Sequence, residues 1–253
     1  MRPPLSVVIA ARDEAARLPL LLADLAVAPE LVREVLVVES GSTDATAAVA
    51  RWAGARLLHS PPGRGAQLVH GIAAAEGPWL LLLHADVRLP PGWRQRLASV
   101  LDGSHKPCRG RLRAWYFELA IAGAGPLLRL VALGAGLRSR FGQRPYGDQG
   151  LLLPRALHDR VGGMRPLPLM EDLEFVERLA RVARLESLGL ALEVDGRRWR
   201  RLGALATTWR NAQLRRAWAR GVAPAVLAER YYRAPQGAYQ KAQRRPRGSS
   251  SHP

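Results

Sequence analysis

Residues 5–83 alternate short apolar runs with stretches in which apolar residues recur at helical spacing. This order predicts parallel βαβ units, and parallel strands need helices on both faces of their sheet. The chain is therefore predicted to be α/β, with a Rossmann-like nucleotide-binding layer in its first half. The expected strands are Leu5–Ala11, Glu34–Val38, Arg56–Leu58 and Trp79–His84, and the helices between them are Glu14–Val27, Asp44–Ala53 and Ala66–Ala75.

The second half of the chain has a less regular pattern. A helix is expected over Trp93–Leu101 and a half-exposed strand over Arg109–Phe117. A further helix is expected over Glu171–Val182, because its two leading carboxylates suit the positive end of a helix dipole. The residues after Arg197 are predicted to be helical and basic. Residues 243–253 are predicted to be a disordered tail, because Pro, Gly and Ser dominate there.

The most apolar stretch, Leu119–Leu137, is interrupted by Pro126 and Arg129 and diluted by four glycines. A membrane-spanning helix needs roughly 20 predominantly apolar residues in a row. We therefore exclude a span and expect a buried helical hairpin. The alternative is a segment that lies in a membrane surface.

A formal net charge of +17 favours a polyanionic partner, such as nucleic acid, anionic lipid or a phosphate-bearing substrate. The sequence has no zinc knuckle, RNA-binding aromatic signature or convincing helix-turn-helix pattern, so nucleic acid is not the expected partner. The single cysteine, Cys108, excludes an intrachain disulfide, and no signal peptide is recognised before the first predicted strand. These features predict a location in the cytoplasm.

Acidic residues follow three of the predicted strands, at the edge where α/β sheets bind ligands. Asp13 and Glu14 follow the first strand, Glu39 and Asp44 the second, and Asp86 the fourth. Helix capping is the alternative role for such residues, and Asp44 is a suitable cap. A carboxylate at the end of a buried strand needs a partner, and for Asp86 a divalent cation bound together with substrate phosphates would supply one.

Three stretches together resemble glycosyltransferase family 2, which has an Asn-Glu pair, then Asp-Gly-x-Ser-x-Asp, then Asp-x-Asp. They are Ala10-Ala11-Arg12-Asp13-Glu14, Glu39-Ser40-Gly41-Ser42-Thr43-Asp44 and His84-Ala85-Asp86, in the family's order and spacing. The resemblance implies the GT-A fold, a mixed central sheet flanked by helices, here followed by a helical basic C-terminal extension. It also implies a nucleotide-sugar donor and a divalent metal, Mg²⁺ or Mn²⁺.

The resemblance also implies roles for individual residues. In the family, the acid at the Glu39 position contacts the nucleotide base, and the carboxylate at the Asp86 position reaches the metal and the sugar diphosphate. Arg64 resembles the family's basic loop, and Glu171-Asp172 resembles its Glu-Asp motif, which bears the base. Arg197-Arg198-Trp199-Arg200 resembles its basic-tryptophan segment. The chain departs from the family pattern at His84, Glu39 and Asp13, which stand where Asp, Asp and Asn are usual.

The predicted reaction is an inverting sugar transfer by single displacement. Asp172 is the predicted catalytic base, with Glu171 as the second candidate, and Asp86 is the predicted metal ligand. The predicted donor-binding residues are Ala10, Glu14, Glu39, Asp44, Arg64, Asp86, Arg198 and Trp199. The predicted acceptor-binding residues are Asp148 and Gln149.

Within the family, residues 146–150 and the arginine-rich C-terminal segment resemble a compact bacterial subgroup that glycosylates carotenoid acids of the diaponeurosporenoate type. This implies an amphiphilic or lipid-like acceptor, and Leu119–Leu137 is apolar enough to shelter one. The segment Trp199–Tyr232 interleaves aromatic residues with arginines, a composition that suits the headgroup region of an anionic membrane. Peripheral attachment to the inner face of the cell membrane is therefore expected, with a fully soluble protein as the alternative.

Three other functions are weighed against this one. A sugar nucleotidyltransferase usually has a glycine-rich loop after its first strand, and Ala10–Glu14 contains no glycine. A dehydrogenase fits less well, because Gly63-Arg64-Gly65 lacks a third glycine and does not follow the first strand. A basic binding protein without turnover is the non-enzymatic alternative. The expected division is residues 1–200 as the GT-A domain, with a donor half over 1–90 and an acceptor half over 91–200, followed by a helical extension over 201–242.

Overall fold

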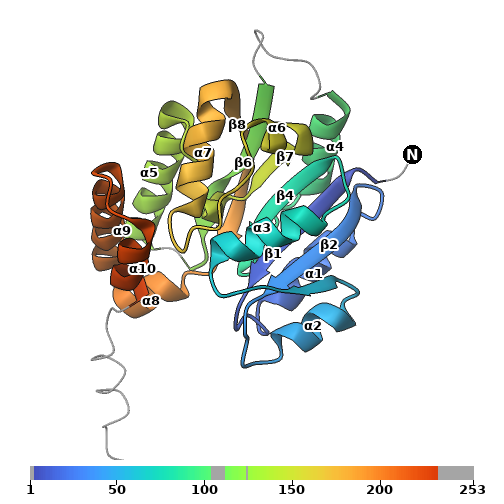
Figure 1. Ribbon diagram of the computed structural model, residues 1–253, viewed down its shortest axis with the longest axis horizontal. Coiled ribbons are helices and arrows are strands. Elements are labelled where there is room, and N and C mark those ends of the chain that lie inside the picture. The colour runs from blue at the N-terminus through green and yellow to red at the C-terminus, as the bar shows by residue number, and fades with distance from the viewer. Residues whose placement is uncertain (1–2, 104–111, 124, 233–253) are drawn as a thin grey trace, which may run out of the picture.

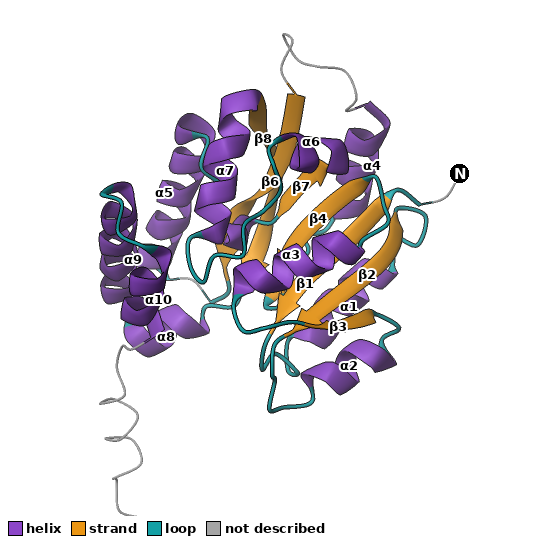
Figure 2. Ribbon diagram, viewed as in Figure 1, coloured by secondary structure: helices purple, strands orange, loops and turns teal. Residues whose placement is uncertain are grey.

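The protein was analysed as a computed structural model, which describes residues 3–103, 112–123 and 125–232. These residues form one eight-stranded sheet with the strand order β3-β2-β1-β4-β7-β6-β8-β5. The strands are β1 (Leu5–Ala11), β2 (Val32–Glu39), β3 (Arg56–His59), β4 (Trp79–His84), β5 (Val87–Arg88), β6 (Leu112–Ile121), β7 (Leu151–Pro154) and β8 (Ala183–Val194). Figure 2 shows this sheet lying between helices.

The sheet has a parallel half and a mixed half. Strands β3, β2, β1 and β4 are parallel, so their carboxyl ends meet at one edge. Strand β7 runs antiparallel to both of its neighbours, β4 and β6, while β6 and β8 are parallel. The predicted parallel βαβ units and the predicted mixed central sheet are confirmed.

Helices cover both faces of the sheet (Figure 1). They are α1 (Leu18–Ala26), α2 (Thr46–Trp52), α3 (Arg64–Ala74), α4 (Trp93–Gly103), α5 (Pro126–Gly142), α6 (Arg155–Arg160), α7 (Glu171–Val182), α8 (Arg197–Leu202), α9 (Ala204–Ala219) and α10 (Pro224–Tyr232), with a 3₁₀ turn, η1, at Gly147–Gln149. Buried side chains of α1, α4 and α5 pack on one face, and those of α3, α6 and α7 pack on the other. The sheet therefore lies between two apolar layers, which hold the ends of its strands in place.

Sequence periodicity placed most elements within a few residues of their observed bounds, and the first helix begins later than predicted. We predicted that helix from Glu14, but α1 begins at Leu18 with Pro19 in its first turn. The carbonyl oxygen of Glu14 instead accepts hydrogen bonds from the N–H groups of Arg17 and Leu18. A turn therefore separates β1 from α1, and it leaves the Glu14 side chain at the edge of the sheet.

The prediction of a buried helical hairpin over Leu119–Leu137 is wrong. Residues 119–121 end strand β6, and residues 126–137 belong to a single helix, α5, which begins at Pro126. Proline is favoured in the first turn of a helix, so Pro126 starts a helix here instead of breaking one. Much of the apolar surface of this helix is also exposed. Leu130, Leu133 and Leu137 are at least half exposed, and Phe141 is 77% exposed.

The predicted helical C-terminal extension is present as α9 and α10, which follow the short helix α8. The Arg210 guanidinium on α9 donates hydrogen bonds to the carbonyl oxygens of Arg230 and Tyr231 at the end of α10, which ties the two helices together. Residues 233–253, including the predicted tail, lie outside the described residues. In the part of the chain that is described, no helix is both long and apolar enough to cross a bilayer.

Candidate active site

Three hollows adjoin one another at the carboxyl edge of the parallel strands. The strand-end pocket has a volume of about 780 Å³ and is lined from β1, the start of α3, the end of β4 and α10, with Ala10, Glu14, Arg64, Asp86, Arg197 and Tyr232 among its residues. The central pocket, of about 330 Å³, shares Arg64, Asp86 and Arg197 with it and adds Tyr146, Asp148, Glu171, Asp172, Trp199 and Arg215. The apolar groove, of about 480 Å³, continues from the central pocket between α5 and α9.

Asp86 lies where the strand-end pocket and the central pocket meet. It follows β4 and the buried Ala85, and its backbone carbonyl accepts a hydrogen bond from the N–H of Asp195 at 3.0 Å. Its Oδ2 lies 3.6 Å from Nη2 of Arg197. The carboxylate is thus held at the cleft by a buried strand, as the sequence predicted.

No group of three or more His, Cys, Asp or Glu side chains in the described residues forms a ready-made metal site. Magnesium and manganese commonly bind through one or two carboxylates, with substrate phosphates and water completing the coordination. Asp86 supplies one carboxylate facing both pockets. The residues present therefore fit a metal that binds together with a diphosphate, and they do not fit a metal held by protein ligands alone.

His84 replaces the first carboxylate of the family motif. Burial, together with the charge of Arg64, lowers the pKa of the His84 ring well below its ordinary value, so the ring is neutral. Its Nε2 has no hydrogen-bond partner among the described residues. It faces Gly147, where an added Cβ would lie only 2.8 Å from this nitrogen. Because the His84 ring is neutral, histidine in place of the family's aspartate removes a negative charge from the site.

A charged network joins the turn after β1 to the start of α8. The Glu14 carboxylate pairs with the guanidinium of Arg197, with one bond of 2.9 Å, and contacts Arg17. Asp195 accepts hydrogen bonds from Arg17, from Arg200 and from the backbone N–H of Arg197. The bond to Glu14 raises the pKa of Arg197. Glu14 therefore fixes Arg197 beside Asp86.

Arg64 begins α3 and faces the helix that carries the predicted base. Its Nη1 lies 3.6 Å from Oε1 of Glu171, which is close enough for an ion pair and too long for a hydrogen bond. Burial raises the pKa of Glu171 to about 7, against the charge of Arg64. Burial alone would lower the pKa of Arg64, but Glu171 and Asp172 raise it.

Asp172, in the first turn of α7, is bound to two backbone N–H groups. Its Oδ2 accepts a hydrogen bond from Gly147 and its Oδ1 one from Leu173, each at 2.7 Å. Gly147 belongs to the turn η1, so this contact brings the Glu-Asp segment to the turn that carries Asp148. A Cβ on Gly147 would lie 3.2 Å from Oδ2 of Asp172, and only glycine leaves this approach open.

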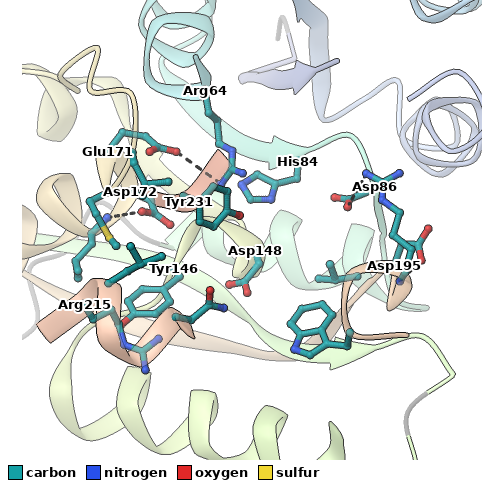
Figure 3. A pocket seen from close by; sticks show the side chains of 18 residues that line it. Arg64, His84, Asp86, Tyr146, Asp148, Glu171, Asp172, Asp195, Arg215 and Tyr231 are labelled. Atoms are coloured by element: carbon teal, nitrogen blue, oxygen red, sulfur yellow. Dashed lines mark hydrogen bonds and ion pairs between the residues drawn. The ribbon is translucent and has the colours of Figure 1, made fainter. Parts of the chain in front are cut away.

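The two predicted acceptor-binding residues differ in environment. Gln149 is fully buried and holds η1 in place, because its side chain bonds to the Phe117 carbonyl, the Ser139 hydroxyl and Arg138. Asp148 lines both the central pocket and the apolar groove. Its Oδ1 has no hydrogen-bond partner among the described residues, and burial raises its pKa to about 6. Figure 3 shows its carboxylate in the pocket, between Tyr146 and Asp86 in that view.

Glu39 and Asp44 stabilise the loops at the strand ends. Glu39 accepts hydrogen bonds from the Ser42 backbone N–H and from His59, and although burial alone would raise its pKa, these bonds lower it. Asp44 is exposed and accepts bonds from the N–H groups of Ala15 and Thr46. Neither side chain is among those lining the three hollows, and their roles toward a donor stay predictions.

The remaining predicted donor-binding residues are Ala10, Trp199 and Arg198. Ala10 lines the strand-end pocket. Trp199 lines the central pocket and the apolar groove, which places it on the side of the predicted acceptor. Arg198 lies on α8, and its side chain is outside the described part of the chain.

Sequence reasoning missed the pocket residues that come from α5, α9 and α10. They include Arg138, Asn211, Arg215, Tyr231 and Tyr232. The mixture of aromatic and basic residues after Trp199 predicts contact with a membrane surface, and it does not indicate a pocket. Arg138 comes from α5, and the other four side chains reach the site because α9 and α10 pack against it.

Comparison with known proteins agrees with this geometry. Residues 6–108 match the sequence model of the family described as Glycosyl transferase family 2. A TPR repeat-containing protein of Synechococcus elongatus is 37% identical over 145 residues. That alignment covers 56% of this chain and 34% of the relative, so the chain spans about a third of the relative's length. The match to the family confirms the predicted resemblance over its first three motifs.

Solved structures share the fold. Glucosyl-3-phosphoglycerate synthase from Mycobacterium tuberculosis, in complex with Mn²⁺, uridine diphosphate and phosphoglyceric acid, superposes with a TM-score of 0.54 and 23% identity, over 74% of this chain and 69% of that one. TarS of S. aureus (residues 1–349) superposes with a TM-score of 0.57 and 18% identity, over 76% of this chain and 60% of that one. The chain has the GT-A fold, as predicted.

Proposed function

We propose that this protein is a glycosyltransferase that moves a sugar from a nucleotide-sugar donor to an acceptor with inversion at the anomeric carbon. The observation that carries this proposal is the meeting of two pockets at Asp86, with the carboxylates Asp148 and Asp172 around the second pocket. One pocket thus receives a donor and the other an acceptor. The family match over residues 6–108 supports the same function.

The strand-end pocket suits a nucleoside diphosphate. Arg64 and Arg197 both line it and place positive charge where the leaving diphosphate gathers negative charge. A divalent cation, Mg²⁺ or Mn²⁺, held by Asp86 and the diphosphate would add further charge stabilisation. Glucosyl-3-phosphoglycerate synthase has been solved with Mn²⁺ or Mg²⁺ and uridine diphosphate, and with Mn²⁺ and uridine diphosphate-glucose.

The central pocket holds the group that activates the acceptor. In a single displacement, the acceptor oxygen forms a bond to the anomeric carbon while the bond from that carbon to the diphosphate oxygen breaks. Asp172 takes the proton that a hydroxyl acceptor loses, and two backbone hydrogen bonds keep its carboxylate oriented. Attack from the face opposite the diphosphate inverts the configuration. Glu171 is the second candidate, but its carboxylate is only 2% exposed and faces Arg64.

The acceptor is amphiphilic or lipid-like in this proposal. The apolar groove opens from the central pocket and is lined mainly by leucine, valine and alanine from β6, α5 and α9. Such a groove shelters an alkyl or polyene chain while the polar end reaches Asp148. A carotenoid acid has this character.

Peripheral attachment to the cytoplasmic face of a membrane is the last part of the proposal. The exposed leucines of α5 lie at helical spacing together with Phe141, and Leu205 and Trp209 are exposed on α9. An exposed apolar surface of this kind, beside arginines, suits the interface of an anionic bilayer. Co-sedimentation with anionic and neutral vesicles at low salt tests it, and equal, negligible binding to both would contradict it.

The proposed activity is tested by incubating the protein with radiolabelled nucleotide sugars, Mn²⁺ and an extract of amphiphilic acceptors. We expect labelled glycoside and free nucleoside diphosphate, and the coupling constant of the anomeric proton should show inversion. Release of pyrophosphate would indicate a sugar nucleotidyltransferase instead. Donor binding without turnover on any acceptor would favour a binding protein.

A further inference from the structure

Two arginines without acidic partners flank one tyrosine where the apolar groove meets the central pocket. The guanidinium carbon of Arg138, on α5, lies 3.6 Å from the centre of the Tyr146 ring, and that of Arg215, on α9, lies 5.7 Å from it. All three side chains line the apolar groove, and Tyr146 and Arg215 also line the central pocket. Figure 3 shows Tyr146 and Arg215 together beside Asp148.

Neither arginine forms an ion pair within the described part of the chain. Arg138 donates hydrogen bonds to the Arg144 carbonyl oxygen at 3.0 Å and to Gln149 Oε1 at 3.2 Å, and both of these acceptors are uncharged. Among the described residues, Arg215 has no hydrogen bond or ion pair, and its guanidinium lies near the Tyr146 ring. The charges of Asp148 and Asp172 both act on Arg138, but neither forms an ion pair with it. Most other arginines of the site have acidic partners, as Arg197 has in Glu14.

Two half-buried guanidinium groups beside the same ring repel each other, and water screens this repulsion only in part. Burial and the charge of Arg215 lower the pKa of Arg138, against the attraction of Tyr146 and Asp148. An opposite charge nearby offsets the cost of partly desolvating these two groups. An anion bound between the two arginines would provide it, and the planar guanidinium is well suited to carboxylate or phosphate.

The groove beside this pair favours an apolar chain attached to that anion. Leu127, Val131, Ala135 and Leu205 line its walls, while the two arginines and Asp148 lie at the end nearest the central pocket. A free small anion would leave this apolar wall exposed to water, whereas an alkyl chain would cover it.

We propose that Arg138 and Arg215 form a subsite for the anionic head group of a single-chain amphiphile, whose chain lies in the apolar groove between α5 and α9. This inference rests on the proposed function, and it adds that the acceptor carries a negative charge. The head group is a carboxylate or a phosphate. In the proposed function the donor diphosphate is recognised separately, by Arg64 and Arg197, which line the strand-end pocket.

Isothermal titration calorimetry with three probes, each below its micelle concentration and without donor, tests the subsite. They are decyl phosphate, decyl maltoside and inorganic phosphate. We expect decyl phosphate to bind at least about tenfold more tightly than either of the others, because only it engages both the arginines and the groove. Decyl maltoside binding as tightly as decyl phosphate would overturn the anionic subsite. If inorganic phosphate bound as tightly as decyl phosphate, the claim that the ligand is an amphiphile with its chain in the groove would be overturned.

Variants assign the binding to these residues. Arg215→Gln breaks no hydrogen bond to the described residues, so it is the cleaner test, and we expect it to weaken decyl phosphate binding about tenfold or more, as loss of one charge-assisted contact predicts. Arg215→Lys should recover part of the affinity. Arg220→Gln, exposed at the end of α9, removes the same charge and should bind normally. Equal loss in both glutamine variants would contradict the subsite.

Donor affinity separates this inference from the proposed function. Arg215→Gln should bind uridine diphosphate with Mn²⁺ as the unsubstituted protein does. A parallel loss of uridine diphosphate binding in this variant would reassign Arg215 to the donor and overturn the subsite. If no form of the protein bound a nucleoside diphosphate, the proposed function would fail, whatever the result with decyl phosphate.

Discussion

The backbone N–H of Gly147 donates a hydrogen bond to Oδ2 of Asp172 at 2.7 Å, and this single bond couples helix α7 to the turn that presents Asp148. The carboxylate proposed as the base is therefore also a support for the acceptor pocket. Substitutions at the two positions should have separable effects, because the asparagine side chain still offers an oxygen to Gly147.

Asp172→Asn is expected to keep donor affinity and to lose roughly 10²-fold or more in turnover, since a base acts only in the transition state. Binding is measured by calorimetry and turnover by release of nucleoside diphosphate in the presence of acceptor. Asp102→Asn, exposed on α4, is a charge-matched control that should behave as the unsubstituted protein does. Near-normal turnover of a folded Asp172→Asn variant would move the role of base to Asp148 or Glu171.

Gly147→Ala is expected to lose activity and to lower the free energy of unfolding by about 1–3 kcal/mol, the usual cost of overpacking. The new methyl group would lie 2.8 Å from His84 Nε2 and 3.2 Å from Asp172 Oδ2. Denaturant unfolding and turnover check this. Gly136→Ala in α5, where no atom lies within 4 Å of the added carbon, should be neutral or slightly stabilising. A fully active Gly147→Ala variant would show that the close approach of η1 to α7 is not needed.

Glu171 is expected to make the stability of the protein depend on pH. Burial raises the pKa of Glu171 to about 7 from an ordinary value of 4.5, so the folded state binds its proton more tightly than the unfolded state. The resulting stabilisation is complete below pH 4.5 and is lost as the pH rises through 7. The free energy of unfolding of Glu171→Gln, minus that of the unsubstituted protein, should therefore be larger at pH 8 than at pH 5. Urea unfolding at the two pH values measures it. A stability difference that does not change with pH would contradict the raised pKa.

Local motifs indicated which carboxylates gather at the carboxyl edge of the sheet, because strand, turn and carboxylate follow one another directly in the chain. The position of Asp86 at the carboxyl edge of the sheet followed from the βαβ pattern, and that of Arg64 from the resemblance to the family's basic loop. The same reasoning could not tell that Glu14 pairs with Arg197, because the two residues are 183 positions apart in the chain. Nor could it tell that Glu39 would hold its own loop, whereas the capping role weighed for Asp44 agrees with its hydrogen bond from the N–H of Thr46.

The acceptor side was less predictable because it is assembled from helices distant in the sequence. The periodicity of α5 is compatible with burial or exposure, and its exposed leucines became apparent only with the neighbouring helices in place. The convergence of Arg138 and Arg215 depends on how α9 packs against α5, and no local pattern encodes it.

The central claim is that the donor binds through Asp86 with a divalent cation. Titration of uridine diphosphate-glucose and other nucleotide sugars into the protein, in Mn²⁺ and in EDTA, tests it most directly, with Asp86→Asn beside the unsubstituted protein. We predict that at least one donor binds at least about tenfold more tightly in Mn²⁺, and that Asp86→Asn removes this difference while leaving the weak metal-free binding in place. Equal donor affinity in Mn²⁺ and EDTA, or a metal effect that persists in Asp86→Asn, would contradict the account.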